Sequence, residues 1–344
     1  MPRSYPYRPL LLTLGGLALL LISLACGLIF GNVALETKVV AGVVANKLWP
    51  GLIEQTWSEG RVGMVWNLRL PRALLAILVG AGLALVGASL QAVTRNALAD
   101  PHLLGISSGG AFGAILALLH TGLFLGAFTV PLLAFLGALS ATALVLGVSR
   151  FTEATSADRL ILAGVAVSFI IMAGANVLIY LGDPKATHTV VYWMLGSLGR
   201  TTYWVELLIP LFILLPCALW LYARAGDLNA MTVGDETAAT LGIHVTRFRL
   251  LVFVVGALIT GVMVAYSGMI GFVGLMVPHI ARLIVGGDYR RVLPASALMG
   301  AIFLIWAMIV ARTALAPDVL PIGIVTGLIG GIFFIWLLRQ RTQA

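Results

Sequence analysis

Residues 73–94 read ALLAILVGAGLALVGASLQAVT and contain no charged side chain. A helix needs roughly 20 apolar residues to cross the hydrocarbon core of a bilayer, so this stretch predicts a membrane-spanning helix. Uncharged tracts of the same kind recur along the whole chain. They are residues 9–35, 101–149, 160–182, 207–223, 250–281, 292–311 and 319–338. The sequence therefore predicts an all-helical protein that crosses a membrane many times.

The composition agrees with a protein that lies almost wholly within the lipid bilayer. Its 344 residues are 60% hydrophobic and 10% charged, and the mean hydropathy of +1.06 is far above that of soluble domains. The polar stretches between the tracts are too short for a soluble catalytic domain. The net charge of +8 is attributed to loops on the cytoplasmic side, where basic residues accumulate, so no nucleic-acid partner is expected.

Two of the tracts are too long for one helix each. A continuous helix over 101–149 would measure about 74 Å, more than twice the thickness of the bilayer core, so a turn is expected at His120–Gly122. The tract 250–281 is expected to turn near Gly268 and Gly271. The ten predicted spans are then 9–31, 73–94, 102–120, 128–149, 160–181, 205–223, 250–269, 272–286, 293–311 and 320–338.

An even number of spans places both termini on one side of the membrane, and the basic residues decide which side. Cytoplasmic termini put 13 of the 21 basic residues inside, as the positive-inside tendency favours. Residues 224–249 then form a cytoplasmic loop. The 13 residues are Arg3, Arg8, Arg95, Arg150, Arg159, Arg224, Arg247, Arg249, Arg282, Arg290, Arg291, Arg339 and Arg341.

Glycines recur at four-residue spacing in two of the predicted spans. Residues spaced in this way share one helix face, where glycine lets the backbones of neighbouring helices approach closely, so we expect tight packing there. The tripeptide Val-Gly-Ala at 79–81 and again at 255–257, five spans apart, is also consistent with an inverted repeat. The two glycine stripes are Gly105, Gly109 and Gly113, and Gly323, Gly327 and Gly331.

Signals of catalysis are weak in this sequence. Residues 105–109, Gly-Ile-Ser-Ser-Gly, match the G-x-S-x-G motif of serine hydrolases, but that motif needs a strand, a sharp turn and a helix. An intramembrane hydrolase that uses Ser107 is the remote alternative. The three lysines lack the GxxxxGK[ST] setting of an ATP site, and the five histidines lack metal-ligand spacing. The chain is therefore not expected to be an enzyme or to hold a metal or cofactor.

An ion-coupled secondary transporter is the second alternative. Such carriers place ionisable residues in the middle of their helices, whereas the tracts here are nearly free of them. Ser168, Met172 and Asn176 do share one face of the span predicted at 160–181. They are candidates for lining a transport pathway, and the competing interpretation is a hydrogen-bonded seam between helices.

Longer segments of the chain resemble a known family. They closely resemble the FecCD-type permeases, the membrane subunits of binding-protein-dependent ABC transporters that import iron-siderophores, haem and cobalamin. The resemblance extends over essentially the whole chain. The residues that carry it are NLRLPR at 67–72, Gly80, Gly87, Gln91, NALADPHLLGISSG at 96–109, YWMLGSLG at 192–199, GFVGLMVPHIAR at 271–282 and LPIG at 320–323.

The resemblance implies the ten-helix type II ABC importer fold of the cobalamin permease, in the inner membrane of a bacterium. It also implies three partners: a second permease copy, a cytoplasmic dimer of ATP-binding subunits that holds ATP and Mg²⁺, and a periplasmic substrate-binding protein. On family frequency an iron-siderophore or haem is favoured as the cargo, and cobalamin is the third candidate.

Residues that match the family's functional positions lie on both sides of the predicted membrane. Arg69, Arg72 and Arg312 match outer-face arginines that receive acidic residues of the binding protein. Thr155 and Ser156 lie where the family places a cytoplasmic gate, in a stretch that departs somewhat from related sequences, and they could equally cap the helix that follows them.

The loop at 224–249 contains GDETAATLGI at 234–243, which predicts a short helix with acidic residues in its first turn and a glycine at its exit. By resemblance this is the coupling helix that fits a groove on the ATP-binding subunit. The residues to which that role is assigned are Asp235, Glu236, Leu241, Gly242 and Ile243.

Overall fold

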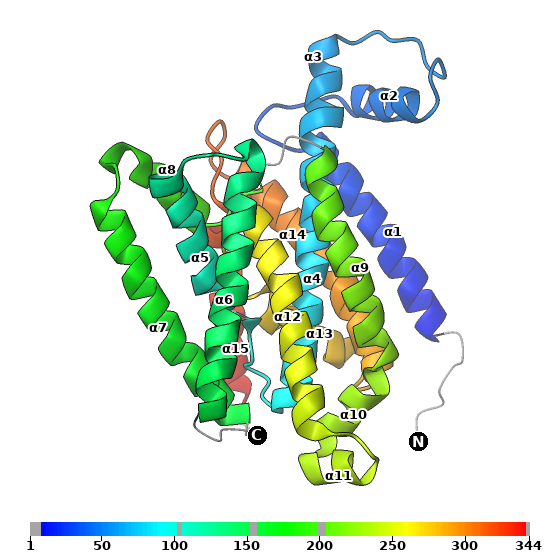
Figure 1. The fold of residues 1–344 in the computed structure, drawn as a ribbon. Helices are drawn as coiled ribbons and strands as arrows, with labels where there is room; N and C mark the ends of the chain where they lie inside the picture. Colours follow the sequence, from blue (N-terminus) through cyan, green and yellow to red (C-terminus); the bar gives the residue numbers. More distant parts are fainter. Residues whose placement is uncertain (1–7, 102–104, 152–156, 199–203, 342–344) are drawn as a thin grey trace.

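The computed structural model describes residues 8–101, 105–151, 157–198 and 204–341, and every regular element within them is a helix. The long helices stand side by side in one bundle (Figure 1). One end of the bundle carries α2 (Thr37–Leu48) and α3 (Glu59–Val62) and is named the α3 end. The opposite end carries α10 (Ala225–Val233) and α11 (Asp235–Thr240) and is named the α11 end. Helix α1 begins and α15 ends at the α11 end.

Among the described residues, seven helical segments are long and apolar enough to cross a membrane. Three shorter apolar helices accompany them, and each of the ten predicted ranges overlaps one of these ten segments. The count of ten spans itself remains a prediction. The seven are α1 (Arg8–Ile29), α3 with η1 (Gly63–Arg69) and α4 (Leu70–Thr94), η4 (Gly126–Phe128) with α6 (Thr129–Phe151), α7 (Ala157–Leu181), η5 (Trp204–Leu207) with α9 (Leu208–Ala223), α12 (Val245–Ser267) and α14 (Tyr289–Thr313); the three are α5 (Ile106–Leu116) with η3 (Ala117–Thr121), α13 (Val273–Val285) and α15 (Ile322–Arg341).

The turns that were predicted inside the two long tracts are present. Helix η3 ends at Thr121, and Gly122 follows with φ of +68°. Helix α12 ends at Ser267, and Gly268 follows with φ of +67°. Both values lie in the left-handed region, which glycine enters without steric cost, so each glycine lets the chain reverse.

Glycines set the closest helix contacts inside the bundle. Gly87 of α4 lies against the backbone of Gly274 in α13, and Gly80 of α4 lies against Gly300 of α14. A methyl group at Gly80, Gly87 or Gly300 would collide with backbone atoms. Because lipid tails are as apolar as the helices, close backbone approach is a main source of helix association in a membrane.

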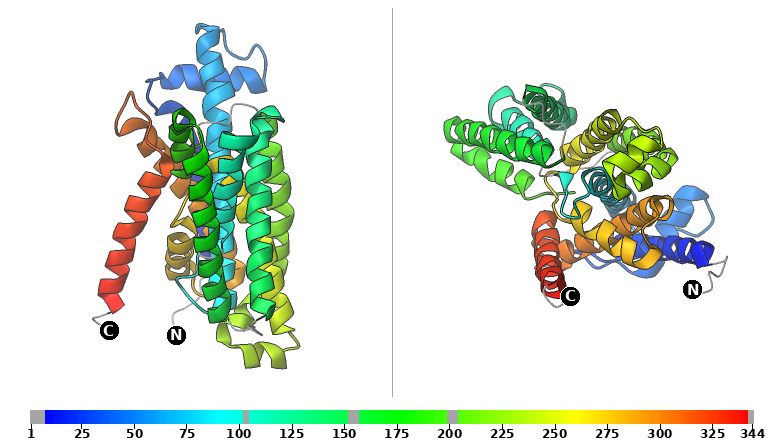
Figure 2. Two further views of the ribbon diagram at one scale, coloured as in Figure 1. Left: turned by 60° about the vertical axis from the view of Figure 1, so that its left-hand side comes forward. Right: turned by 90° about the horizontal axis from the view of Figure 1, so that it is seen from below.

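The two glycine stripes differ in what they contact. Gly109 and Gly113 pack against the backbone of α6, as predicted, whereas Gly105 precedes α5 with φ of +78°. In the second stripe only Gly323 lies against another segment, and Gly327 and Gly331 face open space. Helix α15 lies at the edge of the bundle (Figure 2). It contacts the bundle through Gly330, which lies against Phe272, and through Phe333, whose ring lies 6.0 Å from that of His279. Gly327 and Gly331 lie outside these contacts.

The segment before the second predicted span is more ordered than its polar sequence indicates. The helix that contains this span begins at Glu59 and runs through η1 into α4, so it projects beyond the bundle at the α3 end. Helix α2 lies across this projection and encloses a small second core that includes Val43, Trp57 and Val65. The search for uncharged tracts missed this helical extension, because the extension contains charged residues and lies outside the apolar layer.

Candidate docking and coupling sites

The three arginines assigned to the outer face all lie at the α3 end of the bundle. Arg69 ends η1, Arg72 lies in the first turn of α4, and Arg312 lies in the last turn of α14. The charges of Arg69 and Arg72 act on the Arg312 guanidinium, so the fold does bring the three together. Three arginine side chains therefore lie at one end of the bundle.

Arg69 is buried, with 5% of its surface exposed, and its guanidinium is engaged inside the chain. Its Nη1 donates to the carbonyl oxygens of Leu28 and Ile29, each at 2.7 Å, and its Nη2 donates to the carbonyl oxygen of Val33. Leu28 and Ile29 are the last residues of α1, whose carbonyl groups have no partner within the helix. Arg69 thus caps α1 and holds it against η1.

Arg312 is also buried, at 8% exposed, whereas Arg72 is only partly covered. Of the three arginine residues, Arg72 therefore has the largest exposed fraction. The sequence contained no sign of this difference, because all three arginines border apolar tracts in the same way.

The predicted helix in the 224–249 loop is present as α11. Asp235 and Glu236 occupy its first turn. Its exit is a Schellman motif, in which the Ile243 amide donates to the Ala238 carbonyl at 3.1 Å and the Gly242 amide donates to the Ala239 carbonyl at 2.9 Å. Gly242 has φ of +82°, as the prediction of a left-handed exit requires.

The assigned coupling residues do not all face the same way. Leu241 is 68% exposed at the tip of the bundle, and Val233, just before α11, is 71% exposed. Glu236 and Gly242 are exposed as well, whereas Asp235 and Ile243 are half-buried. The sequence assignment omitted Val233, although an apolar residue in a polar loop was a usable signal. Two apolar side chains thus flank α11 on its outer surface.

Among the described residues, the Ser168 hydroxyl of α7 lies beside Gly105, at the start of α5, but its hydrogen bond stays within α7. The Ser168 hydroxyl donates to the Gly164 carbonyl of its own helix at 2.7 Å. Met172 is half-buried and Asn176 is exposed. Their role in lining a pathway stays a prediction. The gate candidates Thr155 and Ser156 lie outside the described residues.

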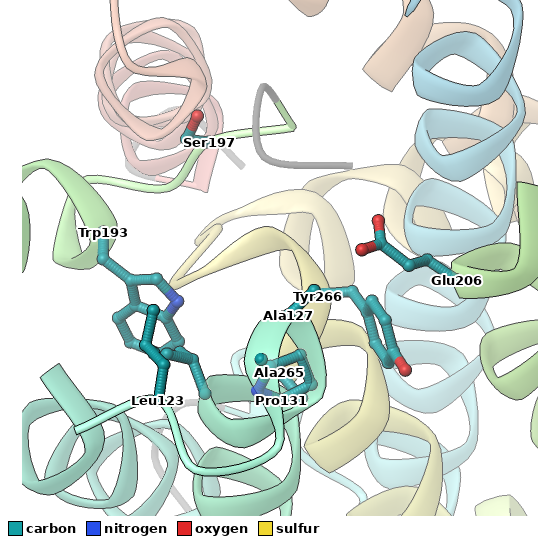
Figure 3. A pocket seen from close by; sticks show the side chains of 10 residues that line it. Leu123, Ala127, Pro131, Trp193, Ser197, Glu206, Ala265 and Tyr266 are labelled. Atoms are coloured by element: carbon teal, nitrogen blue, oxygen red, sulfur yellow. The ribbon is translucent and has the colours of Figure 1, made fainter. Parts of the chain in front are cut away.

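A pocket at the α3 end contains a buried carboxylate that the sequence did not single out (Figure 3). Glu206 of η5 is 6% exposed, and Trp193 and Tyr266 line the same pocket. Its volume is about 120 Å³, and a second pocket beside His188 and Tyr192 has about 260 Å³. Both fall below the roughly 300–1,000 Å³ of typical small-molecule sites. Neither pocket is large enough for a metal chelate.

Ser107 lacks the surroundings of a nucleophile. Its side chain is 3% exposed in the first turn of α5, and its hydroxyl has no hydrogen-bond partner among the described residues. A catalytic serine needs a base within hydrogen-bond reach and access for substrate. The hydrolase alternative therefore has no support from this geometry.

Comparison with known proteins places the chain in a family. The model of the FecCD transport family matches residues 19–340. The hemin transport system permease protein HmuU of Yersinia pestis is 38% identical over 338 residues, which cover 96% of this chain and 97% of that protein. The vitamin B12 import system permease protein BtuC of Citrobacter koseri is 39% identical over 310 residues, which cover 89% of this chain and 92% of that protein. The chain belongs to the FecCD transport family.

Solved structures agree with this assignment. A transporter assigned to the metal-chelate type of ABC transporter, in an inward-facing conformation, matches with a TM-score of 0.81 and 31% identity over 96% of this chain and 99% of the other. PsaBC from Streptococcus pneumoniae, in complex with a Fab, matches with a TM-score of 0.59 and 16% identity over 86% of this chain and 94% of the other, which supports the fold alone. The fold is thus that of an ABC transporter permease.

Proposed function

We propose that this protein is the membrane permease of a binding-protein-dependent importer, which moves a metal chelate into the cytoplasm with energy from a separate ATP-binding subunit. The observation that carries the proposal is the division of the bundle into two unlike ends. Grouped arginines occupy one end, and a capped helix flanked by exposed apolar residues projects from the other. One end suits an acidic protein partner, and the other suits a partner with an apolar groove.

The α11 end is the proposed cytoplasmic side, in the inner membrane of a bacterium with ten membrane spans and both termini in the cytoplasm. Val233 and Leu241 are the proposed anchors for the ATP-binding subunits, because removing exposed apolar side chains from water on binding is favourable. Glu236 would contribute at the rim. ATP and Mg²⁺ would be held by those subunits and not by this chain.

The α3 end is the proposed docking face for the substrate-binding protein. Exposed charge steers an oppositely charged partner and sets its register. Arg72 is the residue best placed for a direct contact, and the charges of Arg69 and Arg312 add to the field around it. Acidic residues on the partner are the expected counterparts.

A second copy of the chain is proposed to complete the pathway. The chelate needs more space than either pocket of one chain provides. Helices α7 and α15 also present apolar side chains away from the bundle, among them Phe169 at 74% and Ile332 at 69% exposed. The open glycines Gly327 and Gly331 leave a flat strip on α15 that a helix from another copy could approach closely.

The cargo is proposed from the relatives. HmuU is named for hemin and BtuC for vitamin B12. Hemin and vitamin B12 are both large metal chelates. An iron-siderophore or haem is the favoured cargo for this chain, with cobalamin third. The Glu206 pocket is too small to select among them, so selection is assigned to the binding protein.

Reconstitution of the transporter in vesicles tests this function. Uptake of haemin, a ferric siderophore or cobalamin should require ATP, the ATP-binding subunit that co-purifies with the permease, and its binding protein. The permease alone should neither hydrolyse ATP nor accumulate any of the three chelates. Uptake by the permease alone, driven by an ion gradient, would establish the secondary transporter instead. Labelling of Ser107 by a serine-directed probe would support the hydrolase.

A further inference from the structure

Helix α11 has few apolar contacts that could fix its position. It is six residues long, and Ala238 is its one buried side chain. Gly234 comes directly before the helix, and Gly242, with φ of +82°, forms its exit. A short helix between two glycine turns can change direction easily. The contacts of Asp235, its first residue, therefore decide how α11 is held.

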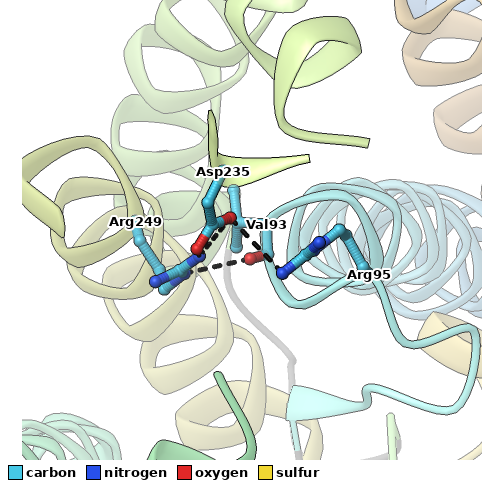
Figure 4. A network of polar contacts seen from close by, with 4 residues as sticks. All are labelled: Val93, Arg95, Asp235 and Arg249. Atoms are coloured by element: carbon cyan, nitrogen blue, oxygen red, sulfur yellow. Dashed lines mark hydrogen bonds and ion pairs between the residues drawn. The ribbon is translucent and has the colours of Figure 1, made fainter. Parts of the chain in front are cut away.

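Asp235 meets two arginines that come from different helices (Figure 4). The Nη2 atom of Arg249, in the second turn of α12, donates to both carboxylate oxygens of Asp235 at 2.8 Å. The Nη2 atom of Arg95, which follows α4, lies 3.6 Å from Oδ1 of the same carboxylate. One carboxylate thus joins α11 to both α12 and α4.

Arg249 is the more firmly held of the two arginines. Its side chain is 3% exposed, and its Nε donates to the carbonyl oxygen of Val93, in the last turn of α4, at 3.0 Å. A buried guanidinium that loses its carboxylate becomes a poorly compensated buried charge, which is strongly unfavourable. The Arg249–Asp235 pair should therefore stay intact when α11 moves.

Arg95 forms the weaker contact. Its side chain is 48% exposed and that of Asp235 is 38% exposed. Ion pairs between exposed groups contribute little stability, and water replaces them readily. The backbone of Arg95 is fixed by the end of α4, where it adopts a left-handed conformation with φ of +51°. This pair can open and close while the backbone on either side stays in place.

The two helices joined by Asp235 lie at the centre of the bundle. They are the most buried of the seven long helices, with 78% of the apolar stretch buried for the helix that includes α4 and 72% for α12. Gly82 of α4 faces Ile259 of α12, and Gly256 of α12 faces Val86 of α4. Because this contact is tightly packed, a displacement of the α12 end acts directly on α4.

We propose that Asp235, Arg249 and Arg95 form a clasp that transmits movement of α11 to α4 and α12. Arg249 is its permanent arm, and Arg95 is the arm that opens. The three are positioning residues, so Asp235 acts inside the permease and does not serve as a contact for the ATP-binding subunit. The clasp rests on the proposed function, since α11 moves only when that subunit drives it.

Two variants of Asp235 and a matched control test the clasp. Asp235→Asn removes the charge, and Asp235→Glu keeps it. Asp227→Asn is the control, because the Asp227 carboxylate pairs with Arg224 at 2.7 Å, three residues away in the same short segment. The first readout is amide hydrogen exchange of the isolated permease. The α11 amides should exchange about tenfold faster in Asp235→Asn, the factor given by about 1.4 kcal/mol, and not in Asp227→Asn.

The second readout uses the complex purified through a tag on the permease, with and without ATP–Mg²⁺ and vanadate. The wild-type complex should show a nucleotide-dependent change in amide exchange along α4 and α12. In Asp235→Asn the ATP-binding subunit should stay bound and hydrolyse ATP. The nucleotide-dependent change in amide exchange along α4 and α12 should nevertheless fall at least about fivefold. Asp235→Glu should restore most of this change. A role confined to stability would lower protection in α11 without removing the response to nucleotide.

The contrary results are distinct. If Asp235→Asn matches Asp227→Asn in both readouts, there is no clasp. If Asp235→Asn loses the ATP-binding subunit, Asp235 belongs to the docking surface and the proposal is overturned. A wild-type permease that holds no ATP-binding subunit would overturn the proposed function, and exchange in the isolated permease would still decide whether Asp235 holds α11.

Discussion

Arg69 and Arg72 are one helical turn apart, yet their side chains have different tasks. Arg69 donates to carbonyl groups at the end of α1, whereas Arg72 is partly exposed. A cation beside a helix C-terminus satisfies orphan carbonyl oxygens and interacts favourably with the helix dipole. At the residue scale, the LRLPR motif therefore combines a structural arginine with one available to a partner.

The stability of the permease should separate these two arginines. Arg69→Met is expected to lower the free energy of unfolding by about 2–3 kcal/mol, because it leaves buried carbonyl groups without a donor. Arg72→Met, the matched control, should change it by less than about 1 kcal/mol. Thermal unfolding of the purified protein in detergent measures both. Equal losses would mean that Arg69 does not cap α1.

Docking of the binding protein should depend on Arg72 and on salt. Arg72→Glu is expected to weaken binding at least about tenfold at low ionic strength, with a smaller effect in high salt, because exposed charges are screened over about 8–10 Å. Titration of the binding protein onto the permease in nanodiscs measures this. An affinity unchanged at both salt concentrations would remove Arg72 from the docking face.

At the scale of single elements, α11 is defined by its ends. Its acidic first turn suits the positive end of the helix dipole, and the Schellman motif at Gly242 satisfies its last carbonyl groups. Both features were visible in the sequence. What the sequence did not contain is the direction of Asp235, since a carboxylate at a helix start could as well have faced a partner.

A glycine pair tests the exit of α11. Gly242→Ala should destabilise this exit by about 1 kcal/mol, because alanine is strained at φ of +82°. Gly226→Ala, inside α10 and with nothing within 4 Å of the added methyl group, should be neutral or slightly stabilising. Amide exchange at residues 235–243 measures the difference. Matching exchange in the two variants would argue against a strained exit.

The glycine stripes make a second prediction at this scale. Gly113→Ala places a methyl group against the backbone of Leu133 and should cost about 1–3 kcal/mol. In Gly331→Ala the added methyl group meets nothing within 4 Å among the described residues and should leave the stability of a single copy unchanged. Thermal unfolding in detergent distinguishes them. A comparable loss for Gly331→Ala would place α15 closer to the bundle than in this structure.

At the scale of the whole molecule, the open faces of α7 and α15 are the feature that one copy does not explain. A helix that is apolar all round suits lipid or another protein, but lipid contact gives no reason for a strip of glycines. Gly327 and Gly331 lie outside the contacts that Gly330 and Phe333 of α15 make with the bundle, so this strip stays available at its edge. Association of two copies accounts for both features.

Replacing the strip should therefore affect association and leave folding intact. Gly331→Phe is expected to shift the permease from dimer to monomer, because a large side chain blocks the close approach of a second α15. Leu14→Phe on α1, where the native side chain is 54% exposed on another side of the bundle, is the control. Light scattering in detergent measures the mass. A dimer that persists in Gly331→Phe would exclude this face.

Hydropathy and charge by themselves determined the class of fold, the turns after Thr121 and Ser267 and the capped helix α11, because each follows from local rules of length, glycine geometry and helix ends. The long sequence motifs predicted the family, and the match of the FecCD family model to residues 19–340 confirms that prediction. An extended helix such as α3–η1–α4 was missed, since hydropathy does not register helix outside the apolar layer.

Only the tertiary structure decided which charged groups turn inward. Arg69 donates to a carbonyl group at the end of α1, 40 residues earlier in the chain. Arg249 donates to a carbonyl group at the end of α4, 156 residues away. Partners so distant in sequence leave no local pattern, because they meet only when helices pack. The pattern of residues therefore specified the helices, and their packing specified which arginines hold the permease together and which remain available to other proteins.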